Sequence, residues 1–178
     1  NDRFGRPLLF VDLDHDGYDD LVAGSDRSDF ANGQRRSVYI FRGGPNFNTR
    51  GLVDLATTSA DSMILGELAS TTMTTALTAG DVNGDGIKDL VLVDSLLTVV
   101  GISPEESRPQ AGAAYILFGS TSFFDTPVRD FENGEWDVKM LGAEAGDNTG
   151  GSSIFGGGIC QSLACGDFDN DSFDDIAI

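Results

Sequence analysis

Residues 12–20 read DLDHDGYDD, which places five acidic side chains and a glycine within nine positions. Similar stretches follow at 81–89, DVNGDGIKD, and at 167–175, DFDNDSFDD. Like charges packed this closely repel one another, so a folded chain needs a counter-charge beside them. Each stretch also runs into a short apolar segment of the kind that forms β-strands. The three stretches therefore predict acidic turns that join two strands and bind cations.

The spacing of the acids matches an oxygen-ligand scheme for Ca²⁺. Positions 1, 3, 5 and 9 carry a carboxylate or an amide, and position 7 can offer its backbone carbonyl. Mg²⁺ prefers a strict octahedron with retained waters, and zinc prefers nitrogen or sulfur ligands. We predict three Ca²⁺ sites. Their ligands are Asp12, Asp14, Asp16, Tyr18 and Asp20; Asp81, Asn83, Asp85, Ile87 and Asp89; and Asp167, Asp169, Asp171, Phe173 and Asp175.

The loops differ from an EF-hand, and from one another, at a few positions. The bidentate glutamate of an EF-hand at position 12 is replaced by apolar residues, so the ion is expected to fasten a β-hairpin and not to open a pair of helices. Asn83 removes one charge from the second loop. Ser172 stands where the other loops have glycine, which predicts strain in the third turn if its φ is positive.

The acidic loops belong to a longer repeat. Tyr39 and Tyr115 lie 76 residues apart, and the same offset relates Phe47 to Phe123 and Asp54 to Asp130. It also relates Leu65-Gly66 to Leu141-Gly142. The spacings that differ between the two copies fall in segments rich in Gly, Ser and Pro, where surface loops accept insertions. The chain therefore divides into units at 1–72 and 73–158, with the start of a third at 159–178.

Each complete unit contains four short apolar runs bounded by turn-forming residues. Runs of this length, rich in Val, Ile, Leu, Tyr and Phe, are typical of strands. They lie at 7–11, 20–24, 37–41 and 62–66 in the first unit, and at 75–80, 89–93, 113–118 and 138–142 in the second. Four strands per repeat predict an all-β fold of β-propeller blades, each with four antiparallel strands. A β-solenoid is the alternative architecture.

Composition narrows the classes of partner. The 178 residues carry 29 acidic and 11 basic side chains, for a formal charge of −18, and 40% of them are hydrophobic. So negative a surface repels nucleic acid and anionic membranes, and no apolar run is long enough to span a bilayer. The spacing of Cys160 and Cys165 matches no metal motif, and whether they form a disulfide stays open.

These motifs resemble the FG-GAP repeat of integrin alpha-subunit β-propellers. Phe4-Gly5 corresponds to the "FG" pair, the acidic loops to the family's D-x-[DN]-x-D-G-x-x-D-[LI] motif, and AGAAYILF (111–118) to its tyrosine-containing strand. The "GAP" triplet has diverged at 24–26 and is lost at 94–96. The resemblance implies a seven-bladed propeller with calcium in the blade hairpins, of which this chain supplies about two and a third blades. We therefore expect a segment of a longer polypeptide or an assembling subunit.

The resemblance and the composition together suggest a non-catalytic, extracellular or cell-surface module for adhesion or ligand binding. The chain has a single histidine, His15, at a loop position expected to face solvent, so a Ser-His or Cys-His catalytic pair finds little support. A protein or glycan ligand at the propeller loops, or neighbouring copies of the chain, are the expected partners. The alternatives are an accessory propeller of an extracellular enzyme such as GPI-specific phospholipase D, a lectin-like propeller, and a subunit of a cell-surface filament.

Overall fold

The computed structural model describes residues 4–25, 35–56, 58–67, 76–101, 103–150 and 163–178. In these residues the fold is all-β: the helical segments are single 3-10 turns, and there is no α-helix. No helix in this part of the chain is long and apolar enough to span a membrane. The predicted fold class is therefore confirmed, although the described residues do not close into a ring.

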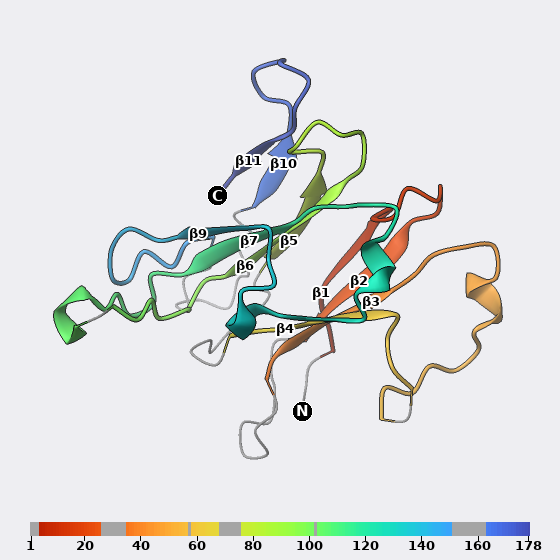
Figure 1. Ribbon diagram of the computed structural model, residues 1–178, viewed down its shortest axis with the longest axis horizontal. Helices are drawn as coiled ribbons and strands as arrows, with labels where there is room; N and C mark the ends of the chain where they lie inside the picture. Colours follow the sequence, from red (N-terminus) through yellow and green to blue (C-terminus); the bar gives the residue numbers. More distant parts are fainter. Residues whose placement is uncertain (1–3, 26–34, 57, 68–75, 102, 151–162) are drawn as a thin grey trace.

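The first unit forms a sheet whose order is β1-β2-β3-β4-β8. Strands β1 (Phe4–Val11), β2 (Asp20–Ser25), β3 (Ser37–Phe41) and β4 (Ser62–Leu65) are antiparallel neighbours, as the four apolar runs predict. The fifth strand, β8 (Val128–Asp130), comes from the second unit and pairs in parallel with β4. Figure 1 shows this segment crossing from the second sheet to the edge of the first. The sequence did not predict this strand.

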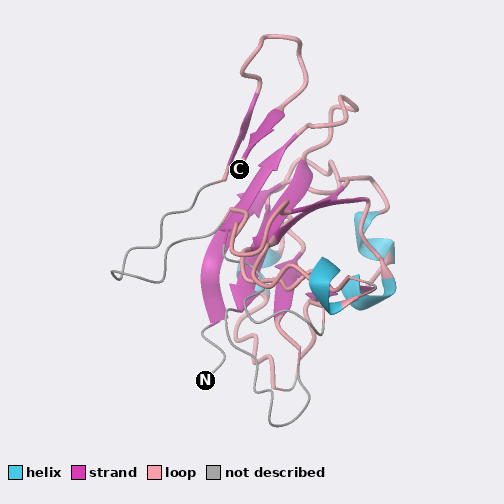
Figure 2. Ribbon diagram, turned by 90° about the vertical axis from the view of Figure 1, so that its left-hand side faces the viewer, coloured by secondary structure: helices cyan, strands magenta, loops and turns pink. Residues whose placement is uncertain are grey.

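The second unit forms a four-stranded antiparallel sheet, in the order β5-β6-β7-β9. Its strands are β5 (Ala76–Gly80), β6 (Asp89–Asp94), β7 (Ala113–Leu117) and β9 (Val138–Leu141). The third unit is represented by the hairpin of β10 (Ala164–Gly166) and β11 (Asp175–Ala177). The hairpin extends at one end of the molecule in both ribbon views (Figures 1 and 2). The 3-10 turns are η2 (Phe47–Thr49), η3 (Pro104–Glu106), η4 (Phe123–Asp125) and η5 (Phe131–Asn133).

The sheets of successive units meet along their first strands, because β1 contacts β5 and β5 contacts β10. This is the arrangement in which the innermost strands of adjacent propeller blades lie side by side. Every residue of β6 and β7 is buried, so the two middle strands of the second sheet are covered on both faces. One hydrophobic core runs through both complete units, from Val22 and Ile40 to Leu92 and Tyr115.

Polar contacts also join the two complete units. The Tyr115 hydroxyl donates a hydrogen bond of 2.8 Å to Oε1 of Glu67, and Lys139 forms an ion pair with the same oxygen. Burial and the adjacent Glu67 carboxylate raise the pKa of Tyr115, which keeps its phenol protonated as a donor. The backbone N–H of Ser120 donates to the carbonyl of Leu13 at 2.9 Å. The units are thus fixed to each other by packing and by hydrogen bonds.

The repeat provides a matched test of the core. Phe123 is 1% exposed, and the guanidinium of Arg129 lies 4.2 Å above its ring, whereas its repeat counterpart Phe47 is 38% exposed. We expect Phe123→Ala to lower the free energy of unfolding by about 3–5 kcal/mol, because it leaves a cavity in the core. Phe47→Ala serves as the control and should cost roughly 1 kcal/mol or less. Equal losses in denaturant titrations would contradict the burial of Phe123.

Candidate metal centres

All three acidic loops connect the two strands of a hairpin: β1 to β2, β5 to β6, and β10 to β11. The three loops lie along the same side of the molecule, at the top of the view in Figure 1. The sheet positions them because position 9 of each loop is the first residue of the outgoing strand, as Asp20, Asp89 and Asp175 show. The predicted placement of these loops between strands is therefore confirmed.

The loops share one pattern of backbone hydrogen bonds. The carboxylate at position 1 accepts the N–H groups of positions 5 and 6, at 2.8–3.1 Å in each loop. The position-5 carboxylate accepts the N–H of position 7 at 2.8–3.0 Å, and the position-9 carboxylate accepts the N–H of position 2 at 2.9–3.0 Å. The same geometry recurs three times. The acidic side chains therefore hold the backbone of the turn in place, in addition to making it negatively charged.

Positive φ angles at two positions give the turn its tight curvature. At position 6, Gly17 and Gly86 both have φ of 86°, and Ser172 has φ of 78°, which bears out the strain predicted for the third loop. Position 4 is also left-handed, with φ of 59° at His15 and 67° at Asn170. The sequence analysis missed this second requirement. The signal for it in the sequence is Gly84 in the second loop and Asn170 in the third, because glycine and asparagine both tolerate positive φ.

Two of the loops gather three carboxylates. One oxygen from each of Asp12, Asp14 and Asp20 lies within 4.8 Å of the others, and the same holds for Asp167, Asp169 and Asp175. These are positions 1, 3 and 9 of the predicted ligand set. In the second loop, Asn83 occupies position 3, which leaves Asp81 and Asp89 as the carboxylates of that set. Two acidic clusters that could bind a metal ion are therefore present in the described residues.

Position 5 does not belong to either cluster. Oδ1 of Asp16 accepts the N–H of Tyr18, and Oδ2 lies 3.4 Å from Nη2 of Arg42. In the second loop the side-chain amide of Asn83 donates to Oδ2 of Asp85 at 3.1 Å. The roles of Asp16, Asp85 and Asp171, and of the Tyr18, Ile87 and Phe173 carbonyls, as metal ligands stay predictions.

The carboxylate of Asp14 is the least satisfied acid of the first loop. The residue is 4% exposed, and its buried oxygens have no well-formed hydrogen bond apart from the contact of Oδ2 with Arg42. Its counter-charge is Arg42, whose Nη2 lies 2.6 Å from Oδ2 as an ion pair. Burial and the neighbouring Asp16 raise the pKa of Asp14, while Arg42 opposes the rise. A buried carboxylate with unsatisfied oxygens is energetically costly, and a cation bound beside it would remove that cost.

A glycine just after the third strand of each complete unit contacts the position-9 carboxylate of that unit, and the sequence analysis did not identify these two glycines. The N–H of Gly43 donates to Asp20 at 2.7 Å, and the N–H of its repeat counterpart Gly119 donates to Asp89 at 2.9 Å. A Cβ atom at Gly43 would lie 2.4 Å from the carbonyl oxygen of Asp19, and one at Gly119 would lie 2.3 Å from that of Lys88. The sequence contains a signal for these glycines, since each follows one of the two repeat-related tyrosines, Tyr39 and Tyr115, by four residues.

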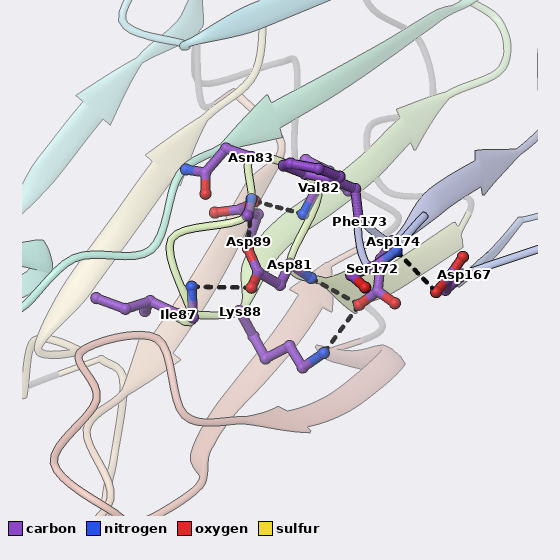
Figure 3. Close-up of polar contacts among 12 residues, drawn as sticks. Asp81, Val82, Asn83, Ile87, Lys88, Asp89, Asp167, Ser172, Phe173 and Asp174 are labelled. Carbon is purple, nitrogen blue, oxygen red and sulfur yellow. Dashed lines mark hydrogen bonds and ion pairs between the residues drawn. The ribbon is translucent and has the colours of Figure 1, made fainter. Parts of the chain in front are cut away.

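The second and third loops are in direct contact (Figure 3). Oδ2 of Asp174 accepts the N–H of Asp81 at 2.7 Å and forms an ion pair of 2.8 Å with Lys88. The hydrogen bond from Lys88 lowers the pKa of Asp174. The Phe173 ring covers Gly84, where any Cβ would lie 2.1 Å from the ring. Adjacent acidic loops are therefore packed together, with one lysine between their carboxylates.

Hairpins of a repeated four-stranded sheet that each carry an acidic turn define a class of β-repeat, and two of the turns have acidic clusters that could bind a metal ion. Residues 12–92 match the family profile of the FG-GAP-like repeat, and this part of the chain is an FG-GAP-like repeat segment. The match begins at the first acid of the first loop and ends within β6, just past the second loop. No curated protein matches the chain.

The strained serine of the third loop gives a direct test of the turn. Ser172→Gly removes a left-handed non-glycine residue, which should stabilise the loop by about 1 kcal/mol and raise its affinity for calcium roughly fivefold. The reverse change in the first loop, Gly17→Ser, is the matched control and should weaken that loop by a similar factor. Calcium titrations followed by calorimetry measure both, and a weaker third site in Ser172→Gly would contradict the assigned φ.

The buried carboxylate at position 9 predicts a pH dependence. Burial is the largest cause that raises the pKa of Asp20 from 3.8 to about 6, and hydrogen bonds from Gly43 and Leu13 reduce the shift. The folded protein therefore binds a proton that the unfolded chain does not bind at the same pH. In chelator, the melting temperature should rise as the pH falls through about 6 towards 4.

Two controls accompany this pH experiment. Calcium bound to the carboxylate should suppress the rise, and Asp20→Asn should make it smaller even in chelator. A rise of the same size in Asp20→Asn would assign the effect to other groups.

Proposed function

We propose that this chain is a calcium-binding β-propeller segment of an extracellular or cell-surface protein, and that it serves adhesion or ligand binding and not catalysis. The FG-GAP-like repeat at 12–92, the stacked sheets and the three hairpin loops support the propeller assignment. The observation that carries the calcium proposal is the cluster of Asp12, Asp14 and Asp20, in which the Asp14 carboxylate is buried and the positive charge in contact with it is the single guanidinium of Arg42.

Ca²⁺ suits this donor set better than other biological cations do. The clusters offer only oxygen atoms, which excludes a preference for zinc or copper. Their carboxylates come from a short, curved turn. The position-5 carboxylate of each turn accepts a backbone N–H, so we expect the remaining ligands to be backbone carbonyls and water. Ca²⁺ accepts six to eight oxygens at variable angles, whereas Mg²⁺ requires near-octahedral geometry. We propose three calcium sites, of which the second has one fewer carboxylate.

In this proposal the ions are structural. Each would lie between the strands of a hairpin and neutralise acids whose mutual repulsion opposes the turn. The rigid loops and sheets would then present the variable connections to a protein or glycan ligand. The same arrangement would serve an accessory propeller of an extracellular enzyme, a lectin or a filament subunit. Glycan arrays, and the activity of any domain covalently linked to this segment, separate these alternatives.

Calcium titration tests the proposal. Isothermal calorimetry should detect three calcium ions per chain, and free calcium at a hundredfold excess over Kd should stabilise the fold by about 2.7 kcal/mol. Mg²⁺ at the same concentration should have a smaller effect. Asp14→Asn should remove the first site alone, and His15→Asn, at the exposed neighbouring position, should leave all three. The absence of both heat and a thermal shift at millimolar calcium would refute the proposal.

A further inference from the structure

Ser172 is the residue of the third acidic loop that the turn itself does not explain. It occupies position 6 with φ of 78°, where the other two loops have glycine. Its backbone N–H donates to Oδ2 of Asp167 at 3.0 Å (Figure 3), but Gly17 and Gly86 make the same bond to the position-1 carboxylates of their own loops. Within the described part of the chain, the Ser172 hydroxyl has no hydrogen-bond partner. The side chain therefore adds strain to the turn without a compensating contact.

The residue two positions earlier supplies a reason for the serine. Asn170, Asp171 and Ser172 form the tripeptide Asn-x-Ser, which is the acceptor signal for N-linked glycosylation when the middle residue is not proline. It is the only Asn-x-Ser or Asn-x-Thr tripeptide in the 178 residues. The signal requires a hydroxyl at its third position, so glycine, the residue that the turn prefers, would destroy it. Position 6 of this loop thus has two conflicting requirements, and serine meets the second.

The side chain of Asn170 is accessible and is not used by the turn. Asn170 is exposed, and its amide forms no hydrogen bond with any described residue. It occupies position 4, outside the cluster of Asp167, Asp169 and Asp175. Its φ of 67° is a left-handed value that asparagine tolerates. A group attached to this amide would therefore replace none of the three clustered carboxylates.

A unit that follows does not by itself cover position 4. His15 occupies this position in the first loop and is exposed, although the second unit packs against the first. Gly84 occupies it in the second loop, beneath the Phe173 ring, where no Cβ atom fits. A side chain is therefore present at position 4 where the next loop leaves room, and absent where the next loop covers it. Asn170, which has a side chain, belongs with His15 in this comparison.

From these observations we propose that Asn170 is an acceptor for an N-linked oligosaccharide. Nδ2 of Asn170 would form a bond to the anomeric carbon of the sugar, the bond from that carbon to the diphosphate of a lipid-linked oligosaccharide donor would break, and the amide would lose a proton. The strain at Ser172 then follows from keeping the hydroxyl that the signal requires. The inference rests on the proposed extracellular location, because this modification belongs to secreted chains.

Secretion of the whole chain from eukaryotic cells, behind an added leader peptide, tests the inference. The secreted chain should carry a single glycan. Peptide:N-glycosidase should remove it and convert Asn170 to aspartate, which peptide mass spectrometry detects. Ser172→Thr should keep the glycan, since either hydroxyl completes the signal. Ser172→Gly should lose it completely and still bind calcium, because glycine relieves the turn, so misfolding would not account for the loss.

Transfer of the signal to the first loop provides a matched control. The double variant His15→Asn and Gly17→Ser creates the same tripeptide where the second unit is in place, and it should gain a further glycan. A secreted wild type without sugar on Asn170, or a glycan that persists in Ser172→Gly, would overturn the inference. Calcium titration of the same secreted chain separates the two proposals, since a chain that binds calcium but carries no sugar contradicts the glycan site alone.

Discussion

The concentration of negative charge at the hairpin turns is the constraint on which the rest of this structure depends. Each acidic loop brings four oxygen-bearing side chains within one tight turn, and the position-9 carboxylates of the first two loops are buried. Backbone N–H groups satisfy some of their oxygens, but a hydrogen bond from a neutral amide does not cancel a charge. Three bound Ca²⁺ ions would change the formal charge from −18 to −12. Cations bound in the turns, as we propose, would offset this charge.

Arg42 provides a positive charge beside the acidic cluster of the first loop. Its guanidinium lies against Asp14 and Asp16, where it supplies part of the positive charge that the cluster requires. A single arginine cannot reach the oxygens of Asp12 and Asp20 as a small ion at the centre could. We expect calcium and Arg42 to compete for Asp14. In the second and third loops, Lys88 bridges to Asp174 from outside the ligand set, and there it joins neighbouring loops.

Much of this architecture could be predicted from the sequence, because the signals were local and repeated. The eight main strands follow apolar runs bounded by turns, and the threefold acidic motif fixed the positions of the hairpins. Strand β8 was missed, since its three residues, Val-Arg-Asp, have no strand signature and are ordered by contacts with a distant segment. The same reason applies to Gly43 and Gly119: their close approach to the loops is a tertiary contact, visible in the sequence only through the offset of 76 residues.

The structure adds detail to the ligand set that the linear pattern does not contain. A linear motif treats positions 1, 3, 5, 7 and 9 as equivalent donors, whereas the fold gathers positions 1, 3 and 9 and turns the position-5 carboxylate to its own backbone. The sequence could not distinguish these contacts, because they depend on the three-dimensional curvature of the turn.

A crystal structure of the chain grown in calcium, with anomalous scattering used to locate the ions, tests the central claim most directly. We predict one calcium ion within each of the three turns, bound by the carboxylates or amide of positions 1, 3 and 9, with Arg42 displaced from Asp14. Turns without anomalous density, with the Arg42 guanidinium still paired to Asp14, would contradict it.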